Sequence, residues 1–513
     1  MKNNSRTKAA LINSGVATMT QIINLILNFV SRTFFIKILG EQILGLNGLF
    51  VNLLNILAFT ELGIGSAITF SLYLPLAKKD IPQIQALMQL YRKTFHIIAL
   101  IIFVGGIGIM LFLPKMIAGS PHVGNIFLAF SLFLANSIFS YLWSYKRSIF
   151  IASQRGYVNG LNQMIFNLAM QIVQIIFLFL TESYYIYLII QILFTVASNL
   201  QISKLANRDF SYLNSKVHMR VDSKTIEYLK KNILGMVSSK IGGVVVFGTD
   251  NIIISSFIGL AAVGRFSNYT LVLNGVNAII GQLVNAVTPS IGNFKIEKNK
   301  TEQVNLFYQY TQLNAYIVLF SAVVLSLLFP SFIRIWIGTE YQLSNSLTTI
   351  IVLGFFINGL RNSNLNFMNA YGTFWEMRYK SIWEAILNLF LSLILIRYTN
   401  LGIGAVVLGT VGANLLINAW WEPLIVLKYG IKISELKYIK LYLVLLISGS
   451  CLILVSQVLG NYLLNFDFII ATIIAIVTSA VLLVIYHVVL IIFYPNNYEP
   501  IRFSTIAIKV LRR

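Results

Sequence analysis

Long apolar segments, separated by short polar or charged turns, follow one another along almost the whole chain. A helix that crosses the hydrocarbon core of a membrane needs about 20 mostly apolar residues. Division of the sequence at charges, prolines and glycine turns gives 14 such segments. They are residues 9–36, 43–72, 94–117, 123–152, 158–180, 184–203, 232–257, 265–290, 304–330, 345–370, 381–397, 402–427, 438–460 and 467–493. This pattern predicts an all-α integral membrane protein with 14 transmembrane helices.

A glycine motif recurs in the two halves of the sequence. Residues 38–50 read ILGEQILGLNGLF, and residues 257–269 read FIGLAAVGRFSNY, 219 positions later. Each copy holds two glycines five residues apart and lies between two long apolar segments. The glycines are Gly40 and Gly45 in the first copy and Gly259 and Gly264 in the second. A helix–turn–helix of membrane length is therefore expected to occur twice.

Two further landmarks repeat at an offset of 216 residues. LFLPKMI with Pro114 corresponds to LLFPSFI with Pro330, and the turn 154–157 corresponds to 370–373. Six spans in each repeat give both halves the same orientation, so we expect a pseudo-twofold axis along the membrane normal. The predicted regions are an N-terminal lobe (1–203, spans 1–6), a basic cytoplasmic linker (204–231), a C-terminal lobe (232–428, spans 7–12), and two further spans with a basic cytoplasmic tail (429–513).

The composition supports a membrane protein, because the chain is 57% hydrophobic and 11% charged, with a mean hydropathy of +0.78. The net charge of +21 would suggest nucleic acid in a soluble protein, but its distribution indicates topology instead. Of 38 Lys and Arg residues, 28 lie at one predicted face, five at the other and five within spans. Because basic residues gather on the cytoplasmic side, both termini are predicted to be cytoplasmic.

Signatures of catalysis are absent from the sequence. It contains no HExxH, GxxxxGK[ST] or CxxC motif, and its four histidines are far apart. The longest predicted outer loop is residues 331–344, which leaves no room for a catalytic domain outside. Cys451 is the single cysteine, so no intrachain disulfide can form. We expect a protein that is not an enzyme and holds neither metal nor cofactor.

Charged residues inside the predicted spans are the strongest candidates for function, because charge at membrane depth usually faces a cavity or a partner. Five are cations, and Arg and Lys supply several hydrogen-bond donors to phosphate oxygens. The functional interpretation is a cavity that binds a pyrophosphate, and the alternative is snorkelling of these side chains to the headgroups. The predicted cavity cations are Arg32, Lys146, Arg147, Lys240 and Arg361.

Two acidic residues within spans are candidates for gating or ion coupling. Glu61 is expected slightly above the inner layer of cations. Asp250 neighbours the repeat-equivalent of Arg32, so these two charges are expected at similar depth. We hypothesise that Arg32 and Asp250 approach one another when the outer side closes. Two unrelated buried polar residues are the alternative.

Amide side chains are frequent in the first two spans of each predicted repeat. A helix that faces lipid excludes most amides, so these spans are expected to line water, and amides also suit sugar hydroxyls. Hydrogen bonding between helices is the alternative for each of them. The candidates for glycan contact are Asn24, Asn28, Asn47, Asn274 and Asn277.

These residues also carry a resemblance to a known family. The run SRTFFIKILGEQILGLNGLFVNLLNILAFTELGIGSAITFSLYLPLAKKD (31–80), followed by YRKTF, resembles the polysaccharide-transport branch of the multidrug/oligosaccharidyl-lipid/polysaccharide (MOP) exporter superfamily. TDNIIIS (249–255) and SQRGYVNGLNQ (153–163) look like the same family. Within it, the chain is most similar to bacterial flippases for capsule, exopolysaccharide or O-antigen repeat units.

The resemblance implies a two-lobed bundle of 14 helices around a central cationic cavity, working by alternating access. It implies as substrate an undecaprenyl-pyrophosphate-linked oligosaccharide, moved from the inner to the outer leaflet of the bacterial cytoplasmic membrane. By span, the cavity cations of the family correspond to Arg32, Lys240 and Arg361. Membrane lipids, and a polymerase and glycosyltransferases of the same pathway, are the expected partners. Nucleic acid is not.

Three alternatives stay open at this stage. A lipid II flippase and a cation-coupled multidrug exporter would share the fold, although an exporter of cationic drugs should prefer acidic cavity residues. A membrane polymerase or glycosyltransferase would need acidic catalytic residues and a sizeable loop on the reaction side. The energy source is equally open between H⁺, Na⁺ and the membrane potential.

Overall fold

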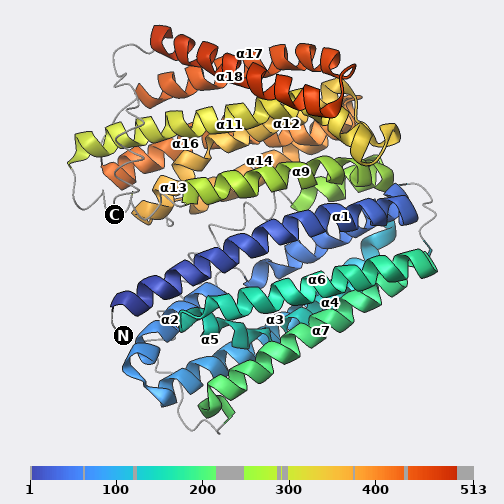
Figure 1. The fold of residues 1–513 in the computed structure, drawn as a ribbon, viewed down its shortest axis with the longest axis vertical. Coiled ribbons are helices and arrows are strands. Elements are labelled where there is room, and N and C mark those ends of the chain that lie inside the picture. Colours follow the sequence, from blue (N-terminus) through green and yellow to red (C-terminus); the bar gives the residue numbers. More distant parts are fainter. Residues whose placement is uncertain are drawn as a thin grey trace. The chain divides into compact units, whose positions relative to one another are not determined.

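Helices make up the described part of the chain in this computed structural model, and no β-strand occurs there (Figure 1). The structure describes residues 3–61, 64–118, 124–214, 248–285, 291, 299–373, 376–432 and 437–493. The predicted all-α class is thus confirmed for these ranges. Lys240, residues 215–231 of the predicted linker and residues 494–513 of the predicted tail lie outside the described residues.

Ten helices in the described ranges are long and apolar enough to cross a membrane. They are Thr18–Leu57, Ile81–Met116, Ile126–Ala152, Gly156–Thr181, Tyr184–Asp209, Lys300–Trp336, Arg378–Tyr398, Ile403–Ile431, Tyr438–Leu463 and Phe468–Phe493. Most of predicted span 232–257 falls outside the described residues, and spans 43–72 and 345–370 are each interrupted. The structure therefore confirms a multi-pass membrane protein.

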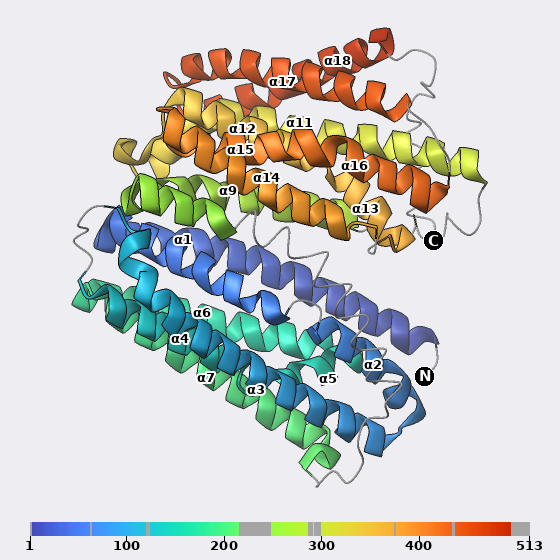
Figure 2. The same ribbon diagram turned by 180° about the vertical axis from the view of Figure 1, so that it is seen from behind.

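The chain divides into two compact units, Met1–Gly264 and Arg265–Arg513. These units are defined by which helices pack together and not by the repeat in the sequence. The predicted boundaries of the two lobes, 1–203 and 232–428, therefore stay a prediction. In unit 1, α7 packs on α4 and α6, and α6 packs on α1 (Figure 2). The elements are α1 (Asn3–Leu57), η1 (Ala58–Glu61), α2 (Ile64–Lys78), α3 (Ile81–Phe112), η2 (Leu113–Met116), α4 (Ile126–Tyr141), η3 (Ser144–Lys146), α5 (Arg147–Ala152), α6 (Gly156–Thr181), α7 (Tyr184–Asp209), η4 (Ser211–Asn214) and a helix over 248–257.

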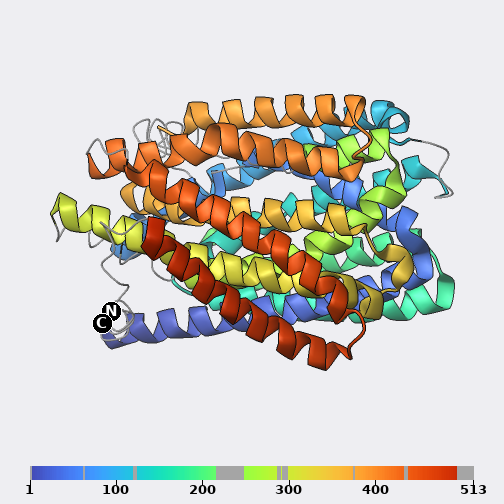
Figure 3. The ribbon, with the colours of Figure 1, turned by 90° about the horizontal axis from the view of Figure 1, so that it is seen from above.

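In unit 2, α11 packs against α12, α17 and α18, and α14 packs along α15. Helices α17 and α18 lie side by side (Figures 1 and 3). The elements are α9 (Leu260–Asn285, whose first five residues belong to unit 1), α11 (Lys300–Trp336), η5 (Thr339–Tyr341), α12 (Asn345–Leu360), α13 (Asn362–Tyr371), α14 (Arg378–Tyr398), α15 (Ile403–Ala413), η6 (Asn414–Asn418), α16 (Ala419–Leu424), η7 (Ile425–Ile431), α17 (Lys437–Leu463) and α18 (Phe468–Phe493).

In the first copy of the glycine motif, the helix is interrupted at a single residue. This interruption is shorter than the turn between two helices that the sequence predicted. Gly40 has φ +81° and separates two helical stretches of α1, and Gly259 has φ +121° just before α9. Positive φ values of this kind suit glycine, which has no Cβ. Gly45 and Gly264, the second glycine of each copy, lie in backbone contact inside unit 1.

Several membrane helices are interrupted, and the interruptions carry polar residues. Between α4 and α5 the chain bends at residues 142–146, where Trp143 has φ +63°. Between α12 and α13 it bends at Arg361, and η6 and η7 are π-helical. By contrast, α11 continues through Pro330 to Trp336, so the predicted end of that span at residue 330 is wrong. Proline removes a single donor there, which a membrane helix tolerates when neighbours bond the freed groups.

Candidate functional site

Arg361 lies at the interruption between α12 and α13 and is 8% exposed. Its Nη2 is 2.6 Å from Glu422 Oε1, and its Nε donates to both oxygens of Glu422 at 3.1 and 3.2 Å. Its Nη1 is 3.1 Å from Glu384 Oε1. The guanidinium of Arg361 is therefore held between the carboxylates of two other helices, α16 and α14.

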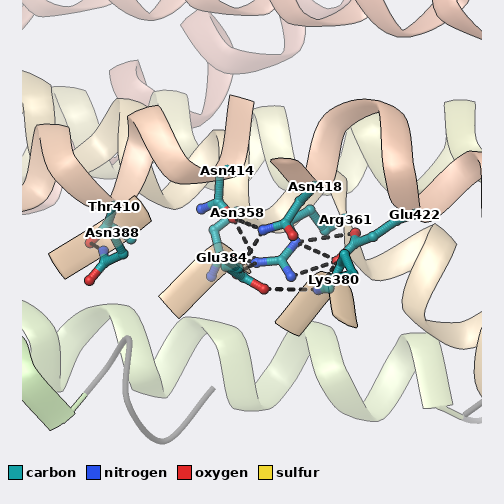
Figure 4. A network of polar contacts seen from close by, with 9 residues as sticks. All are labelled: Asn358, Arg361, Lys380, Glu384, Asn388, Thr410, Asn414, Asn418 and Glu422. Carbon is teal, nitrogen blue, oxygen red and sulfur yellow. Dashed lines mark hydrogen bonds and ion pairs between the residues drawn. The ribbon is translucent and has the colours of Figure 1, made fainter. Parts of the chain in front are cut away.

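Lys380 is a second buried cation of the same cluster. It belongs to the first turn of α14 and is 2% exposed. Its Nζ lies 2.8 Å from Glu384 Oε2 and 2.9 Å from Glu422 Oε1. Each carboxylate thus contacts both cations, which gives a closed ring of four charges (Figure 4).

Asparagine side chains complete this cluster. Arg361 Nη1 donates to Asn414 Oδ1 at 2.7 Å and to Asn358 Oδ1 at 3.1 Å, and Asn418 Nδ2 donates to Glu384 Oε1 at 2.7 Å. Figure 4 shows these side chains converging on the guanidinium. We call the set the charge-balanced cluster, which consists of Asn358, Arg361, Lys380, Glu384, Asn414, Asn418 and Glu422.

The sequence places these residues on two facing stripes with a spacing of four. The stripes are Lys380, Glu384 and Asn388 on α14, and Asn414, Asn418 and Glu422 on the helical run from α15 to η7. Residues four apart lie on one face of a helix. The π-helical turn η6 widens the helix where Asn414 and Asn418 face α14, and such turns are frequent at functional sites.

Within this cluster the two cations balance the two carboxylates, so no net charge is left in the apolar interior. Removal of charges from water is costly, and close pairing with further hydrogen bonds offsets that cost. The cluster joins α12, α14 and α16 by directional contacts that hold these three helices in register. In this conformation the Arg361 guanidinium contacts carboxylates. Its predicted role in binding pyrophosphate stays a prediction.

Unit 1 holds cations at the interruption between α4 and α5, but their partners are different. Arg147 Nη2 donates to Ser198 Oγ at 2.9 Å and to Asn199 Oδ1 at 3.0 Å, and Nη1 donates to Asn159 Oδ1. Lys146 Nζ donates to Ser203 Oγ at 2.9 Å and to Asn207 Oδ1 at 2.6 Å. We call this set the cationic cluster, which consists of Lys146, Arg147, Asn159, Ser198, Asn199, Ser203 and Asn207.

The two clusters differ in charge, although both follow an interrupted helix. All hydrogen-bond acceptors of Lys146 and Arg147 among the described residues are neutral, so the cationic cluster carries two positive charges. At the same end of α6 and α7, Arg155 Nη2 pairs with Asp209 at 2.7 Å and Arg208 Nε pairs with it at 3.0 Å. This end of unit 1 is therefore electropositive, which suits an anion.

The other predicted charged residues lie apart from these clusters. Arg32 is beside Tyr187, and Asp250 Oδ1 is buried without a hydrogen-bond partner in the described part of the chain. The hypothesised approach of Arg32 and Asp250 stays a prediction. Glu61 is hydrogen-bonded to Tyr141.

The predicted glycan-contact amides are dispersed. Asn47 accepts a hydrogen bond from the Tyr184 hydroxyl at 3.1 Å, which matches the alternative of bonding between helices. Asn24 Oδ1 is buried without a partner among the residues described, and Asn28, Asn274 and Asn277 are exposed. Their role in glycan contact stays a prediction. No group of His, Cys, Asp and Glu in the described ranges is suited to hold a metal ion.

Sequence reasoning identified Arg361 but missed the groups around it. Predicted span 381–397 begins one residue after Lys380 and so left this lysine outside the membrane, and Glu384 and Glu422 were not among the predicted site residues. A signal for them was present, namely acidic and amide residues four apart inside apolar spans 381–397 and 402–427. Charge within a span usually has a partner on another helix, and the two stripes offered that partner.

Comparison with known proteins gives a consistent result for the fold. No protein-family model matches the sequence, and no curated protein sequence matches it. Among solved structures, the lipid II flippase MurJ in an inward closed conformation is similar, with a TM-score of 0.62 at 18% identity, over 95% of this chain and 99% of that one. An inward-facing multidrug resistance MATE family transporter of the MOP superfamily gives a TM-score of 0.59 at 13% identity, over 87% and 99%.

A third similar structure is a MOP superfamily transporter from Pyrococcus furiosus, described as having a binding pocket of reverse polarity. Its TM-score is 0.51 at 14% identity, over 84% of this chain and 97% of that one. At these identities a likeness shows the fold. This chain has the fold shared by the lipid II flippase MurJ and the transporters of the MOP superfamily.

Proposed function

We propose that this protein is a MOP-superfamily flippase that moves undecaprenyl-pyrophosphate-linked oligosaccharide repeat units from the inner to the outer leaflet by alternating access. The products would serve capsule, exopolysaccharide or O-antigen synthesis. The observation that carries the proposal is the cationic cluster, where Lys146 and Arg147 contact neutral acceptors. A pyrophosphate would supply the missing negative charge.

The geometry of the cationic cluster supports anion binding. Lys146 has three N–H donors and Arg147 has five. Lys146 makes two hydrogen bonds and Arg147 makes four, so each keeps one donor for a phosphate oxygen. A hydrogen bond to a charged group contributes about 1.5–3 kcal/mol. Arg32, Lys240 and Arg361 remain further candidates for binding a pyrophosphate.

A lipid II flippase is the second candidate. The likeness to the lipid II flippase MurJ over 95% of this chain favours it. A multidrug exporter for cationic drugs is less favoured, because the acids Glu384 and Glu422 are neutralised by Arg361 and Lys380. The transporter with reverse polarity supports the view that this fold accommodates cavities of either charge.

Complementation distinguishes these candidates. The gene is expressed in one strain that lacks its repeat-unit flippase and in another depleted of its lipid II flippase. We expect surface glycan to return in the first strain, with lipid-linked intermediates accessible from outside. If only the second strain were rescued, the protein would be a lipid II flippase and the proposed substrate would be wrong. Rescue of neither, with the protein inserted in the membrane, would refute both.

Variants of the cationic cluster test the role of its charge. The double variant Lys146→Gln/Arg147→Gln should reduce flipping about tenfold or more, as expected for the loss of charge-assisted hydrogen bonds. Lys93→Gln is the matched control, since Lys93 is an exposed cation on α3 of the same unit. If the double variant were as active as Lys93→Gln, the cationic cluster would have no role in substrate transport.

A further inference from the structure

The position of the Lys380 ammonium group resembles that of a bound monovalent cation. It lies between two carboxylate oxygens from different helices, Glu384 Oε2 at 2.8 Å and Glu422 Oε1 at 2.9 Å. The side chains of Lys380 and Glu422 are 2% and 0% exposed, and that of Glu384 is 8% exposed. The aliphatic part of the Lys380 side chain therefore holds the ammonium group at a position that is buried from solvent.

Charge counting shows why a cation is needed at this position. Arg361 alone offsets one of the two carboxylates, and Lys380 offsets the other. The nearby groups of α17, Tyr438 and Tyr442, are phenols and bring no positive charge. Without Lys380 the cluster would carry one negative charge in an apolar interior, and an isolated buried charge is very unfavourable.

We propose that Lys380 is a tethered counter-cation that occupies the place of an exchangeable monovalent cation between Glu384 and Glu422. Unit 2 then needs neither an alkali ion nor a proton at this position. Asn418 Oδ1 is also buried and has no hydrogen-bond donor among the described residues, and Nδ2 of the same side chain donates to Glu384 Oε1 at 2.7 Å. The two carboxylate oxygens would thus face a small cation once the lysine ammonium is removed.

The consequence concerns the energetics of the conformational cycle. A covalently attached cation cannot leave, so α14 and α16 stay joined at constant charge whatever the ion concentrations on the two sides. An exchangeable ion would couple the packing of these helices to its own binding. Lys380 therefore makes the packing at this position independent of free cations, and its replacement should create that dependence. This holds whichever substrate the protein carries.

The experiment measures thermal unfolding of the full-length protein in detergent at alkaline pH, in sodium chloride and in choline chloride of equal ionic strength. The wild type should have the same midpoint in both salts. Lys380→Gln should unfold at a lower temperature in choline, and its midpoint should rise progressively with Na⁺, because a ligand of the native state stabilises it by mass action. A second arm lowers the pH in choline. Recovery there instead would identify a proton as the replacing cation.

Matched variants separate this role from a general loss of packing. Lys380→Arg keeps the charge and should remain insensitive to Na⁺ and to pH. Lys440→Gln removes an exposed cation of α17 in the same unit and should behave like the wild type. A Lys380→Gln variant that is destabilised equally in every salt and at every pH would overturn the proposal.

A double variant covers the case in which Lys380→Gln does not fold. Lys380→Gln/Glu384→Gln removes one charge of each sign, so the cluster is neutral again. We expect this protein to be recovered and to be insensitive to Na⁺. Failure to recover it, or a dependence on Na⁺ that persists in it, would overturn the proposal.

Discussion

The carboxylate of Glu422 is fully buried and accepts hydrogen bonds from both Arg361 and Lys380. Glu422→Gln should lower the free energy of unfolding by about 3–5 kcal/mol, because loss of one partner leaves an uncompensated buried charge. Thermal unfolding in detergent measures the change. Glu340→Gln, an exposed position of η5 in the same unit, should leave the midpoint unchanged. Equal midpoints for the two variants would contradict the charge-balanced cluster.

Single residues were predicted from the sequence with uneven success. Arg361 was found because a cation inside an apolar segment is conspicuous, whereas its environment was not, since Glu384 and Glu422 lie 23 and 61 positions further along the chain. The contact of these two carboxylates with Arg361 depends on how α14 and α16 pack beside α12. The hydrophobic periodicity of a single helix does not predict that packing. The sequence therefore identified a charged position but not the residues that surround it.

At the scale of elements, the glycine motif offers a test of close helix packing. A Cβ added at Gly45 would overlap the backbone carbonyl of Leu260. Backbone cannot yield as a side chain can, so Gly45→Ala should destabilise the protein by about 1–3 kcal/mol, as overpacking does. Gly108→Ala on α3 is the control, since nothing lies within 4 Å of its added Cβ. If the unfolding midpoints of both variants fell by the same amount, the close contact between Gly45 and Leu260 would be contradicted.

The π-helical turn η6 allows a second test at this scale. Deletion of Leu416, an exposed residue of η6, should restore a regular helical turn and rotate Glu422 relative to Asn414 by about 100°, the angle per residue of an α-helix. The deletion should therefore break the contacts of Arg361 with one of them and abolish transport. Leu416→Ala keeps the register and should retain activity in the complementation assay. A fully active deletion variant would show that the register of this helix is unimportant.

Element type was more predictable than element continuity. Hydrophobic length sufficed to place most membrane helices, as for α6 and α7, whose predicted spans 158–180 and 184–203 lie within Gly156–Thr181 and Tyr184–Asp209. The breaks at Arg361 and at residues 142–146 were not predicted. They occur inside apolar segments without proline or glycine turns, and the freed backbone groups are bonded locally. Such breaks depend on neighbouring helices and are weakly encoded in the local sequence.

For the whole molecule, the distribution of basic residues predicts which side of the membrane each end of the bundle faces. Arg155 and Asp209 are in contact, so the start of α6 and the end of α7 share one end of unit 1. Thr181 and Ser183, at the turn between these helices, lie at the opposite end. Because the predicted topology assigns 28 of the 38 basic residues to the side that includes Arg155, we expect that side to be cytoplasmic.

Accessibility of single cysteines tests this orientation. In a Cys451→Ala background, which removes the single native cysteine, the exposed residues Thr181 and Arg208 are replaced by cysteine one at a time. A membrane-impermeant maleimide should label the Thr181→Cys variant in intact cells, and it should label Arg208→Cys only after permeabilisation. The reverse pattern would contradict cytoplasmic termini. It would also place the cationic cluster, whose Lys146 and Arg147 lie toward the Arg155 end of the bundle, on the wrong side to receive a substrate made in the cytoplasm.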